Sequence, residues 1–433
     1  MSYDLSALHV GVVGLGYVGM PLALMLSKNI KVTGFDISAS RVSELRQGID
    51  RNCEIDKECL LDSACTFTSE LSDIKECNIY IVTVPTPIDE HNKPDLSPVI
   101  SATNAVASIL KRGDIVVYES TVYPGVTEDI CGPLLEHASG LKSGKDFFLG
   151  YSPERINPGD AAHTVQKITK VVAGQNEQVT ELLAGLYGTI NNGNIFCATN
   201  IRTAEASKAI ENAQRDINVA FINEVTMIVN KLGLSAYDVL EAAGTKWNFM
   251  KFSPGLVGGH CIGVDPYYLA ECAINIGHEP KIILSGREIN DGMGLYVANC
   301  LHDLLKAMPN EIQAKKILLL GFTFKENIND IRNTKVVDIL RSLVGYGYQV
   351  DVHDPYAVAD SVHHEYGLNI MNTLPIEGNY AAVALLVGHD EYKAYSAKTL
   401  ESILVSKGII YDMKGLWRGV SDDFSRKFSY HTL

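Results

Sequence analysis

The sequence lacks cysteines arranged for metal binding or for disulfide pairing. Its nine cysteines are odd in number and scattered, with no CxxC pair and no histidine at a spacing typical of zinc sites. We therefore expect reduced thiols, a cytoplasmic protein and no bound metal. The first residues contain no basic region followed by a long apolar run, so the sequence predicts no signal peptide.

Long apolar runs and an excess of positive charge are also absent. No segment approaches the roughly 18 consecutive apolar residues that a membrane-spanning helix requires. Acidic residues (51) outnumber basic ones (37), which gives a formal net charge of -14. We therefore expect neither a membrane nor a nucleic acid as partner. Any anionic ligand must be held by local basic side chains or backbone N–H groups.

The 433 residues exceed the size of one ordinary core, and the chain begins with alternating strands and helices. The apolar run HVGVV leads into GLGYVG, a helical segment follows, and the next strand ends at Asp36. The dinucleotide-binding pattern consists of a strand, a glycine-rich turn, a helix and a second strand that ends in an acid, about 20 residues after the first glycine. The predicted cofactor-binding residues of this turn are Gly14, Gly16, Tyr17, Val18, Gly19 and Asp36.

The type of dinucleotide follows from Asp36. Its carboxylate would accept hydrogen bonds from ribose hydroxyls and repel a 2′-phosphate, which favours NAD over NADP. Arg41 leaves NADP open, because it could meet such a phosphate. Thr86 and Thr121 follow two later strands and either line the nicotinamide half of the site or cap their loops.

The middle of the chain changes to a helical pattern. Residues 203–232 contain neither proline nor internal glycine, which predicts a helix of about 45 Å with an apolar flank available for subunit pairing. Strand patterns resume at Lys315. We expect an α/β protein with two Rossmann-like, doubly wound parallel sheets joined by a long central helix and a helical middle domain. The predicted domains are residues 1–200 for NAD, 201–305 for the helical part that contains Cys261 and the apolar flank for pairing, and 306–433 for the second α/β unit.

One segment stands out for covalent chemistry. In PGLVGGHCIGVDPYYL, Cys261 lies among glycines and Asp265 follows four residues later. A thiol on a glycine-rich loop beside a carboxylate can act as a nucleophile, whereas most free cysteines are inert core residues. The segment alone leaves both interpretations open.

Five motifs in this order resemble the UDP-glucose/GDP-mannose dehydrogenase family over essentially the whole chain. They are GLGYVG, SPERINPG, SKAIENAQRDINVAFINE, VGGHCIGVDP and GFTFKENINDIR. The resemblance is strongest to the branch that oxidises UDP-N-acetylhexosamines, UDP-GlcNAc or UDP-GalNAc, at C6 for bacterial surface polysaccharides. It implies a homodimer, a UDP-sugar substrate, and a four-electron oxidation that uses two NAD+ and one water.

The resemblance also implies roles for individual residues. Cys261 matches the nucleophile, while Lys208 and Asn212 match a pair that stabilises the oxyanion; a solvated surface lysine is the alternative for Lys208. Asp265 matches the acid that positions water, and Glu154 matches a base for thioester hydrolysis. The predicted substrate contacts are Arg155, Ile156, Arg215, Gly255, Phe324 and Lys325, and Arg332 is a predicted cofactor contact.

Two departures bear on the substrate. Pro158 stands where UDP-glucose enzymes commonly carry a second glutamate, and Val264 stands where they carry a lysine. Both changes favour an N-acetylhexosamine. The alternatives are a UDP-glucose or UDP-ManNAc dehydrogenase, a two-electron hydroxy-acid dehydrogenase, and an NAD-responsive binding protein without turnover.

Overall fold

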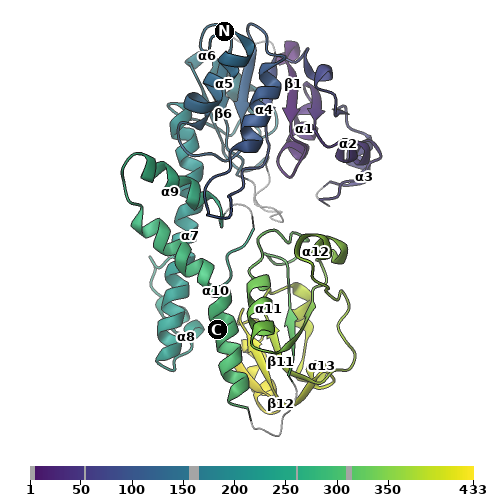
Figure 1. Cartoon of the computed structure of the whole chain (residues 1–433), viewed down its shortest axis with the longest axis vertical. Coiled ribbons are helices and arrows are strands. Elements are labelled where there is room, and N and C mark those ends of the chain that lie inside the picture. The colour runs from purple at the N-terminus through teal and green to yellow at the C-terminus, as the bar shows by residue number, and fades with distance from the viewer. Residues whose placement is uncertain (1–4, 53–54, 156–164, 260–261, 309–314) are drawn as a thin grey trace. The chain divides into compact units, whose positions relative to one another are not determined.

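The computed structural model describes residues 5–52, 55–155, 165–259, 262–308 and 315–433. Two compact units divide the chain (Figure 1). The first comprises residues 1–212 and 267–279, and the second comprises residues 213–266 and 280–433. Each unit contains one β-sheet with helices on both faces. Among the described residues, no helix combines the length and the hydropathy needed to cross a membrane.

The first sheet has the strand order β3-β2-β1-β4-β5-β6-β7-β8. Its strands are β1 His9–Val13, β2 Lys31–Phe35, β3 Thr66–Thr68, β4 Ile79–Val82, β5 Ile115–Tyr118, β6 Phe148–Tyr151, β7 Lys170–Gly174 and β8 Ile195–Cys197. Neighbouring strands pair in parallel except β6 and β7, which pair antiparallel. The prediction of a doubly wound sheet is confirmed, with this one reversal as a difference. An antiparallel neighbour needs no crossover helix, so an alternating pattern does not reveal it.

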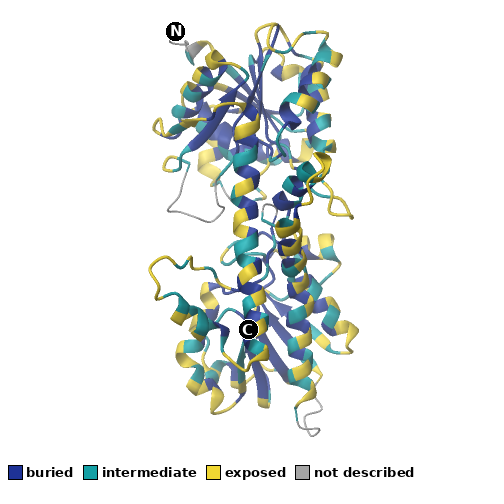
Figure 2. Ribbon diagram, turned by 90° about the vertical axis from the view of Figure 1, so that its left-hand side faces the viewer, coloured by how far each residue is buried: buried dark blue, intermediate teal, exposed yellow. Residues whose placement is uncertain are grey.

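Two apolar clusters sandwich this sheet, which Figure 2 shows as dark strands between helices. One face packs against α1, α2 and α6, and the other packs against α4, α5 and the start of α7. The helices of this unit are α1 Gly19–Ser27, α2 Ala39–Arg46, α3 Lys57–Leu61, α4 Ser97–Ala107, α5 Gly132–Ser139 and α6 Glu177–Gly188, and a π-helical segment, η3, covers Val126–Cys131.

The long helix predicted for residues 203–232 is α7, Ile201–Lys231. Its residues up to Asn212 belong to the first unit and the remainder to the second. Within the second unit α7 packs on α10, Lys281–Lys306, where an added Cβ on Gly286 would lie 3.6 Å from Ala220 Cβ. Close packing at this glycine holds the two helices together. The second unit also contains α8, Ala236–Ala243, while α9, Asp265–Asn275, lies mostly in the first unit.

The second sheet is fully parallel, with the strand order β10-β9-β11-β12-β13. Its strands are β9 Lys316–Leu320, β10 Gln349–His353, β11 Tyr380–Leu385, β12 Leu404–Asp412 and β13 Ser429–Thr432. Helices α10, α11 and α12 cover one face, and an apolar cluster around Trp417 covers the other. The remaining helices are α11 Val336–Gly345, α12 Ala359–Tyr366, α13 Ala397–Glu401 and α14 Ser421–Ser425. A second Rossmann-like unit is thereby confirmed.

Candidate active site

The glycine-rich turn after β1 is shaped for a close ligand. Gly14 has φ +98°, and a Cβ on Gly19 would lie 1.9 Å from the Gly14 carbonyl oxygen. A Cβ on Gly16 would meet nothing within 4 Å. Helix α1 begins at Gly19 and its N-cap residue, Val18, makes no side-chain capping hydrogen bond. The turn thus leaves open space beside uncapped helix N–H groups, which suits a pyrophosphate.

Asp36 lies directly after β2, and two backbone N–H groups hold its carboxylate in place. Its Oδ2 accepts the Leu15 N–H at 2.8 Å, and its Oδ1 accepts the Ser38 N–H at 2.8 Å. The side chain of Arg41 is buried; its Nε donates to the Leu15 carbonyl at 3.0 Å and its guanidinium pairs with Asp50 at 2.8 Å. Arg41 therefore stabilises the glycine-rich turn through its hydrogen bond to Leu15. Its contact to a 2′-phosphate stays a prediction.

The ends of β4 and β5 carry the predicted threonines. Thr86 is buried and Thr121 is half-buried. Sequence reasoning missed Thr83, whose Oγ1 lies 2.7 Å from the Gly14 carbonyl oxygen and 3.1 Å from that of Val13. This hydroxyl ties the end of β4 to the glycine turn. The signal was available, because a polar residue directly after the apolar run IYIV is where such a contact is expected.

Glu154 follows β6, and its Oε2 lies 3.1 Å from the ammonium of Lys170. Arg155 pairs with Glu211 of α7 at 2.7 Å and donates to the Thr169 carbonyl at 3.1 Å. Its predicted contact to substrate therefore competes with an existing ion pair and is untested. Lys170 was missed, although a lysine at the start of the apolar run VVAG is unusual enough to have been noticed.

Lys208 and Asn212 lie one turn apart on α7 and both are buried. Among the described residues, no hydrogen bond or ion pair engages the Lys208 ammonium. The Lys208 side chain is mostly buried, although its Nζ is not among the buried polar atoms that lack a hydrogen-bond partner. Its contact to the substrate stays a prediction. Arg215, one turn further, is exposed.

In the second unit, the backbone of the loop before the cysteine is clamped. Asn223 of α7 accepts the Gly255 N–H at 2.9 Å and donates to its carbonyl at 3.0 Å. Both polar backbone atoms of this predicted substrate contact are therefore engaged by the protein. The same amide donates to Asn290 at 2.8 Å. Asp265 is buried at the first position of α9. Cys261 and Ile156 lie outside the described residues.

The glycines that precede Cys261 in the sequence pack on the predicted nucleotide-sugar segment. A Cβ on Gly258 would lie 2.9 Å from Phe324 Cβ, and one on Gly259 would lie 2.7 Å from its ring. The Gly259 N–H donates to the Arg332 carbonyl at 3.0 Å. The Arg332 guanidinium pairs with Asp330 at 2.5 Å. Within this unit the fold thus brings together two motifs that are far apart in the sequence.

A small hollow lies beside these glycines. It is lined by Gly258, Phe324, Lys414 and the start of α11. The N-cap residue of α11, Lys335, makes no side-chain capping hydrogen bond. Lys414 pairs with Glu326 at 3.0 Å; burial alone would raise the pKa of this glutamate, but the ammonium holds it below its ordinary value. At the start of α11 the Val336 N–H donates to Thr334 Oγ1 at 3.3 Å, and Lys335 pairs with Asp291 at 2.9 Å. An anion bound here would therefore compete with existing contacts.

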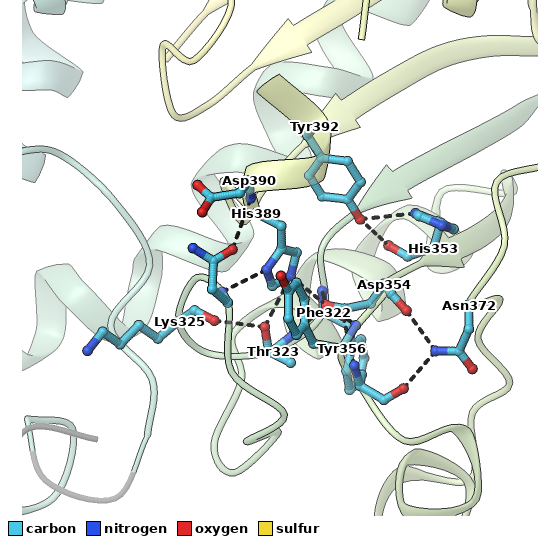
Figure 3. A network of polar contacts seen from close by, with 12 residues as sticks. Phe322, Thr323, Lys325, His353, Asp354, Tyr356, Asn372, His389, Asp390 and Tyr392 are labelled. Carbon is cyan, nitrogen blue, oxygen red and sulfur yellow. Dashed lines mark hydrogen bonds and ion pairs between the residues drawn. The ribbon is translucent and has the colours of Figure 1, made fainter. Parts of the chain in front are cut away.

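A buried network holds the loop that carries Lys325 (Figure 3). Asn327 donates its backbone N–H to His389 Nδ1 at 2.9 Å, so this nitrogen must be the acceptor and Nε2 bears the hydrogen. Nε2 lies 3.0 Å from Asp354 Oδ2. Thr323 Oγ1 donates to the Lys325 carbonyl at 2.9 Å. The side chain of Lys325 points away from this network, which fixes only its backbone (Figure 3).

The glycine-rich turn and the anchored Asp36 carboxylate of the first sheet are those of the NAD-dependent dehydrogenases. The chain belongs to the UDP-glucose/GDP-mannose dehydrogenase family, whose members are NAD-dependent nucleotide-sugar dehydrogenases. Its NAD binding domain matches residues 8–191, its central domain matches residues 202–292, and its UDP binding domain matches residues 318–419. The predicted family and the predicted cofactor are confirmed.

Individual relatives cover nearly the whole chain. A UDP-N-acetyl-D-glucosamine 6-dehydrogenase of Pseudomonas aeruginosa is 52% identical over 94% of this chain and 97% of its own length. An enzyme of the same name from Salmonella typhi is 46% identical over 95% of this chain and 97% of its own length. Among solved structures, a UDP-D-ManNAc dehydrogenase of Pyrococcus horikoshii matches with a TM-score of 0.87 and 30% identity over 98% of this chain and 99% of its own.

Proposed function

We propose that this protein oxidises the C6 hydroxyl of UDP-N-acetylglucosamine to a carboxylate in two successive NAD-dependent steps. The observation that carries this proposal is the 52% identity, over 94% of the chain, to an enzyme whose name states this substrate and position. Val264, in place of the lysine of UDP-glucose enzymes, supports an N-acetylated sugar. Lys208 and Asn212, one turn apart on α7 and both mostly buried, support a site for an oxygen that gains negative charge.

The first unit fits the cofactor. The open space at Gly16 and the uncapped start of α1 would receive the pyrophosphate, and Asp36 would accept the ribose hydroxyls. NAD+, when bound, accepts a hydride from the sugar carbon in each oxidation. Thr86 and Thr121 are proposed to line the nicotinamide half of the site.

In the first oxidation, Lys208 and Asn212 act on the C6 oxygen. The lysine, as the neutral amine, accepts the hydroxyl proton, directly or through water, as the hydride leaves the carbon and thereby becomes an ammonium. Its ammonium and the Asn212 amide stabilise the negative charge on that oxygen. The product of this step is an aldehyde that stays in the site.

The second oxidation requires a nucleophile, because an aldehyde does not readily release hydride until a group has added to it. The thiolate of Cys261 adds to the carbonyl carbon and forms a C–S bond. Loss of hydride from this adduct gives a thioester. Glu154 then takes a proton from water, whose oxygen attacks the acyl carbon, and Asp265 orients that water. The C–S bond breaks, the sulfur leaves as thiolate, and the sugar carboxylate is released.

The second unit is proposed to hold the UDP group. The start of α11, Lys414 and Lys325 supply N–H groups and positive charge for a diphosphate, while Phe324 packs against the nucleotide sugar. Arg155, Arg215 and Gly255 are proposed as further contacts to the sugar, and Arg332 as a contact to the cofactor.

We also propose a cytoplasmic homodimer that supplies a uronic acid for bacterial surface polysaccharides. The exposed apolar side chains on the second half of α7 and just after it, Phe221, Ile228 and Leu232, support subunit pairing along this helix. Sedimentation equilibrium tests this assembly. A monomer at micromolar concentration would contradict the pairing without affecting the proposed chemistry.

The function is tested by NADH release from UDP-GlcNAc, UDP-GalNAc, UDP-ManNAc and UDP-glucose, with product mass for each. We expect two NADH per UDP-GlcNAc and a carboxylate product. One NADH per sugar would overturn the four-electron reaction, and a preference for another sugar would overturn the substrate. Cys261→Ser should lower turnover by a factor of about 10³ or more while NAD affinity stays near normal. Substantial four-electron activity in this variant would contradict the thioester route.

A further inference from the structure

Three ionisable side chains meet at the carboxyl edge of the first sheet. The Lys170 ammonium lies 2.8 Å from Glu119 Oε2 and 3.1 Å from Glu154 Oε2. The lysine side chain is 4% exposed, Glu119 is fully buried, and Glu154 is 14% exposed. Two carboxylates thus share one buried cation, and only Glu154 reaches toward solvent.

The strand arrangement explains this meeting. β5 ends at Tyr118, so Glu119 emerges at the carboxyl edge of the sheet. β6 and β7 are antiparallel, with Gly150 opposite Gly174 and Tyr151 opposite Ala173. Continuing this register by three residues places Glu154 opposite Lys170. Because β7 runs against its neighbour, its first residue lies at the edge where β5 and β6 end.

The surroundings fix Glu119 more firmly than Glu154. Tyr187 of α6 donates its hydroxyl to Glu119 Oε1 at 2.5 Å, and its ring centroid lies 5.2 Å from the Lys170 ammonium. Glu154 Oε1 accepts the Arg155 N–H at 2.6 Å. Burial raises the pKa of Glu119, whereas the two carboxylates raise the pKa of Lys170 against the effect of its own burial. Lys170 is therefore a permanent cation whose charge is divided between its two partners.

We propose that Lys170, with Glu119 as a competing counter-ion, is a positioning residue that holds Glu154 as an oriented carboxylate for hydrolysis of the acyl intermediate. This inference rests on the proposed function, in which Glu154 is the base. Lys170 contributes a fixed charge behind the carboxylate, and Glu119 limits how strongly that charge lowers the basicity of Glu154. Among the described residues, the other ionisable groups beside this cluster are Arg155 and Glu211, which pair with each other, and the neutral phenol of Tyr187.

This arrangement predicts opposite effects for two substitutions. Lys170→Met removes the cation and leaves two carboxylates close together, so Glu154 should hold its proton to higher pH. Glu119→Gln removes the competitor, so Glu154 should ionise at lower pH. A merely structural ion pair would lower activity in both variants without moving the pH profile in opposite directions. Lys170→Arg keeps the charge and should retain the wild-type profile.

The experiment follows the acid limb of kcat for UDP-GlcNAc oxidation by the full chain, together with the intact mass during turnover. We expect Lys170→Met to move the limb up by about one pH unit and Glu119→Gln to move it down, which corresponds to about tenfold in rate on the acid side. An acyl adduct should accumulate in Lys170→Met. The KM for NAD should stay within about twofold in each variant, because the substituted side chains lie away from the glycine turn.

The NADH yield of the wild-type enzyme distinguishes a failure of the proposed function from a failure of the role proposed for Lys170. If it does not release two NADH per UDP-GlcNAc, the proposed function fails first. If it does, and the limbs of Lys170→Met and Glu119→Gln coincide with that of the wild type or move together, the role of Lys170 is wrong while the function stands. Should Lys170→Met fail to fold, as judged by circular dichroism, Glu119→Gln is close in shape to the native side chain and still tests the predicted downward shift.

Discussion

Asp354 holds in the second sheet the position that Asp36 holds in the first. Each follows the second strand of its unit and accepts an N–H from the turn after the first strand, from Leu15 at 2.8 Å and from Phe322 at 2.6 Å. The two turns begin with Gly14 at φ +98° and a glycine, Gly321, at φ +93°.

The two carboxylates nevertheless have different environments. Asp36 is half-buried, whereas Asp354 is fully buried and is also bound by Thr323, Tyr356, Ala357 and His389. A carboxylate whose oxygens already accept this many hydrogen bonds within the protein cannot also accept them from the hydroxyls of a ribose. The same turn is therefore proposed to bind a cofactor in the first unit, whereas in the second unit it holds the loop.

The glycines of the first turn should respond differently to the same added methyl group. Gly19→Ala would place Cβ 1.9 Å from the Gly14 carbonyl oxygen and 2.3 Å from Thr83 Oγ1, so the helix and the turn must separate. We expect a loss of stability of several kcal/mol and loss of NAD binding. Gly16→Ala meets no atom within 4 Å and should fold normally but bind NAD more weakly, because its methyl group occupies ligand space. Thermal melting with NAD titration distinguishes the two; equal melting temperatures would contradict this account.

Charge at Asp36 should set the choice of cofactor. In Asp36→Asn the amide oxygen retains one acceptor for the Leu15 N–H, while the negative charge that repels a 2′-phosphate is lost. We expect kcat/KM for NAD to fall about tenfold and the preference for NAD over NADP to shrink. The exposed Asp62 offers a control, since Asp62→Asn should leave both values unchanged. An unchanged cofactor preference in Asp36→Asn would refute the role of this charge.

Asp354 should stabilise the second unit in a pH-dependent way. Burial alone would raise its pKa, but hydrogen bonds from His389 and from the Phe322 and Thr323 N–H groups lower the pKa to about 2. Its contribution is therefore complete above the ordinary pKa of 3.8 and is lost as the pH falls toward 2. We expect Asp354→Ala to cost about 3 kcal/mol at neutral pH, measured from the urea midpoint, and much less in acid. Asp303→Ala, at an exposed position, should change stability by less than about 0.5 kcal/mol.

Glu205 should make the stability of the folded protein depend on pH in the opposite direction. Its carboxylate accepts the Gly125 N–H at 2.6 Å and the Thr127 N–H at 2.9 Å, but burial raises the pKa to about 7. Between its ordinary pKa of 4.5 and about 7 the native state holds a proton that the unfolded chain releases. Stability should therefore fall as the pH rises through this window, by up to about 3 kcal/mol.

Glu205→Gln cannot ionise and should lose this pH dependence, which melting temperatures across the window would reveal. The exposed Glu181 provides the control, because Glu181→Gln should keep the wild-type slope. Identical slopes for wild type and Glu205→Gln would show that Glu205 does not titrate in this range.

Local patterns were enough to predict the glycine turn, Asp36 and the long helix. In each case the signal lies within one segment, as the sequence of apolar strand, glycines and helix illustrates. The paired lysine and asparagine on α7 were predicted from helical spacing and family resemblance, but their burial depends on what packs against that helix. The sequence therefore did not reveal that the Lys208 side chain is mostly buried.

Long-range contacts could not be predicted in the same way. No local pattern around Arg41 reveals that its guanidinium pairs with Asp50. The hydrogen bond between Asp354 and His389 joins residues that lie 35 positions apart in the sequence. The ion pair of Glu154 with Lys170 depends on a reversed strand, which an alternating pattern of strands and helices does not signal. These interactions are set by strand order and direction, which emerge only when the segments pack together.

The reversal of β7 has a consequence for engineering. Strands that all run one way deliver only their final residues to the ligand edge, so every catalytic group there must come from a strand end or a loop. A strand that starts at this edge instead delivers its first residue there, as β7 delivers the buried Lys170. Grafting the Glu154 loop alone onto an all-parallel dehydrogenase would therefore leave its carboxylate without the supporting ammonium, and a successful transplant would have to carry β7 with it.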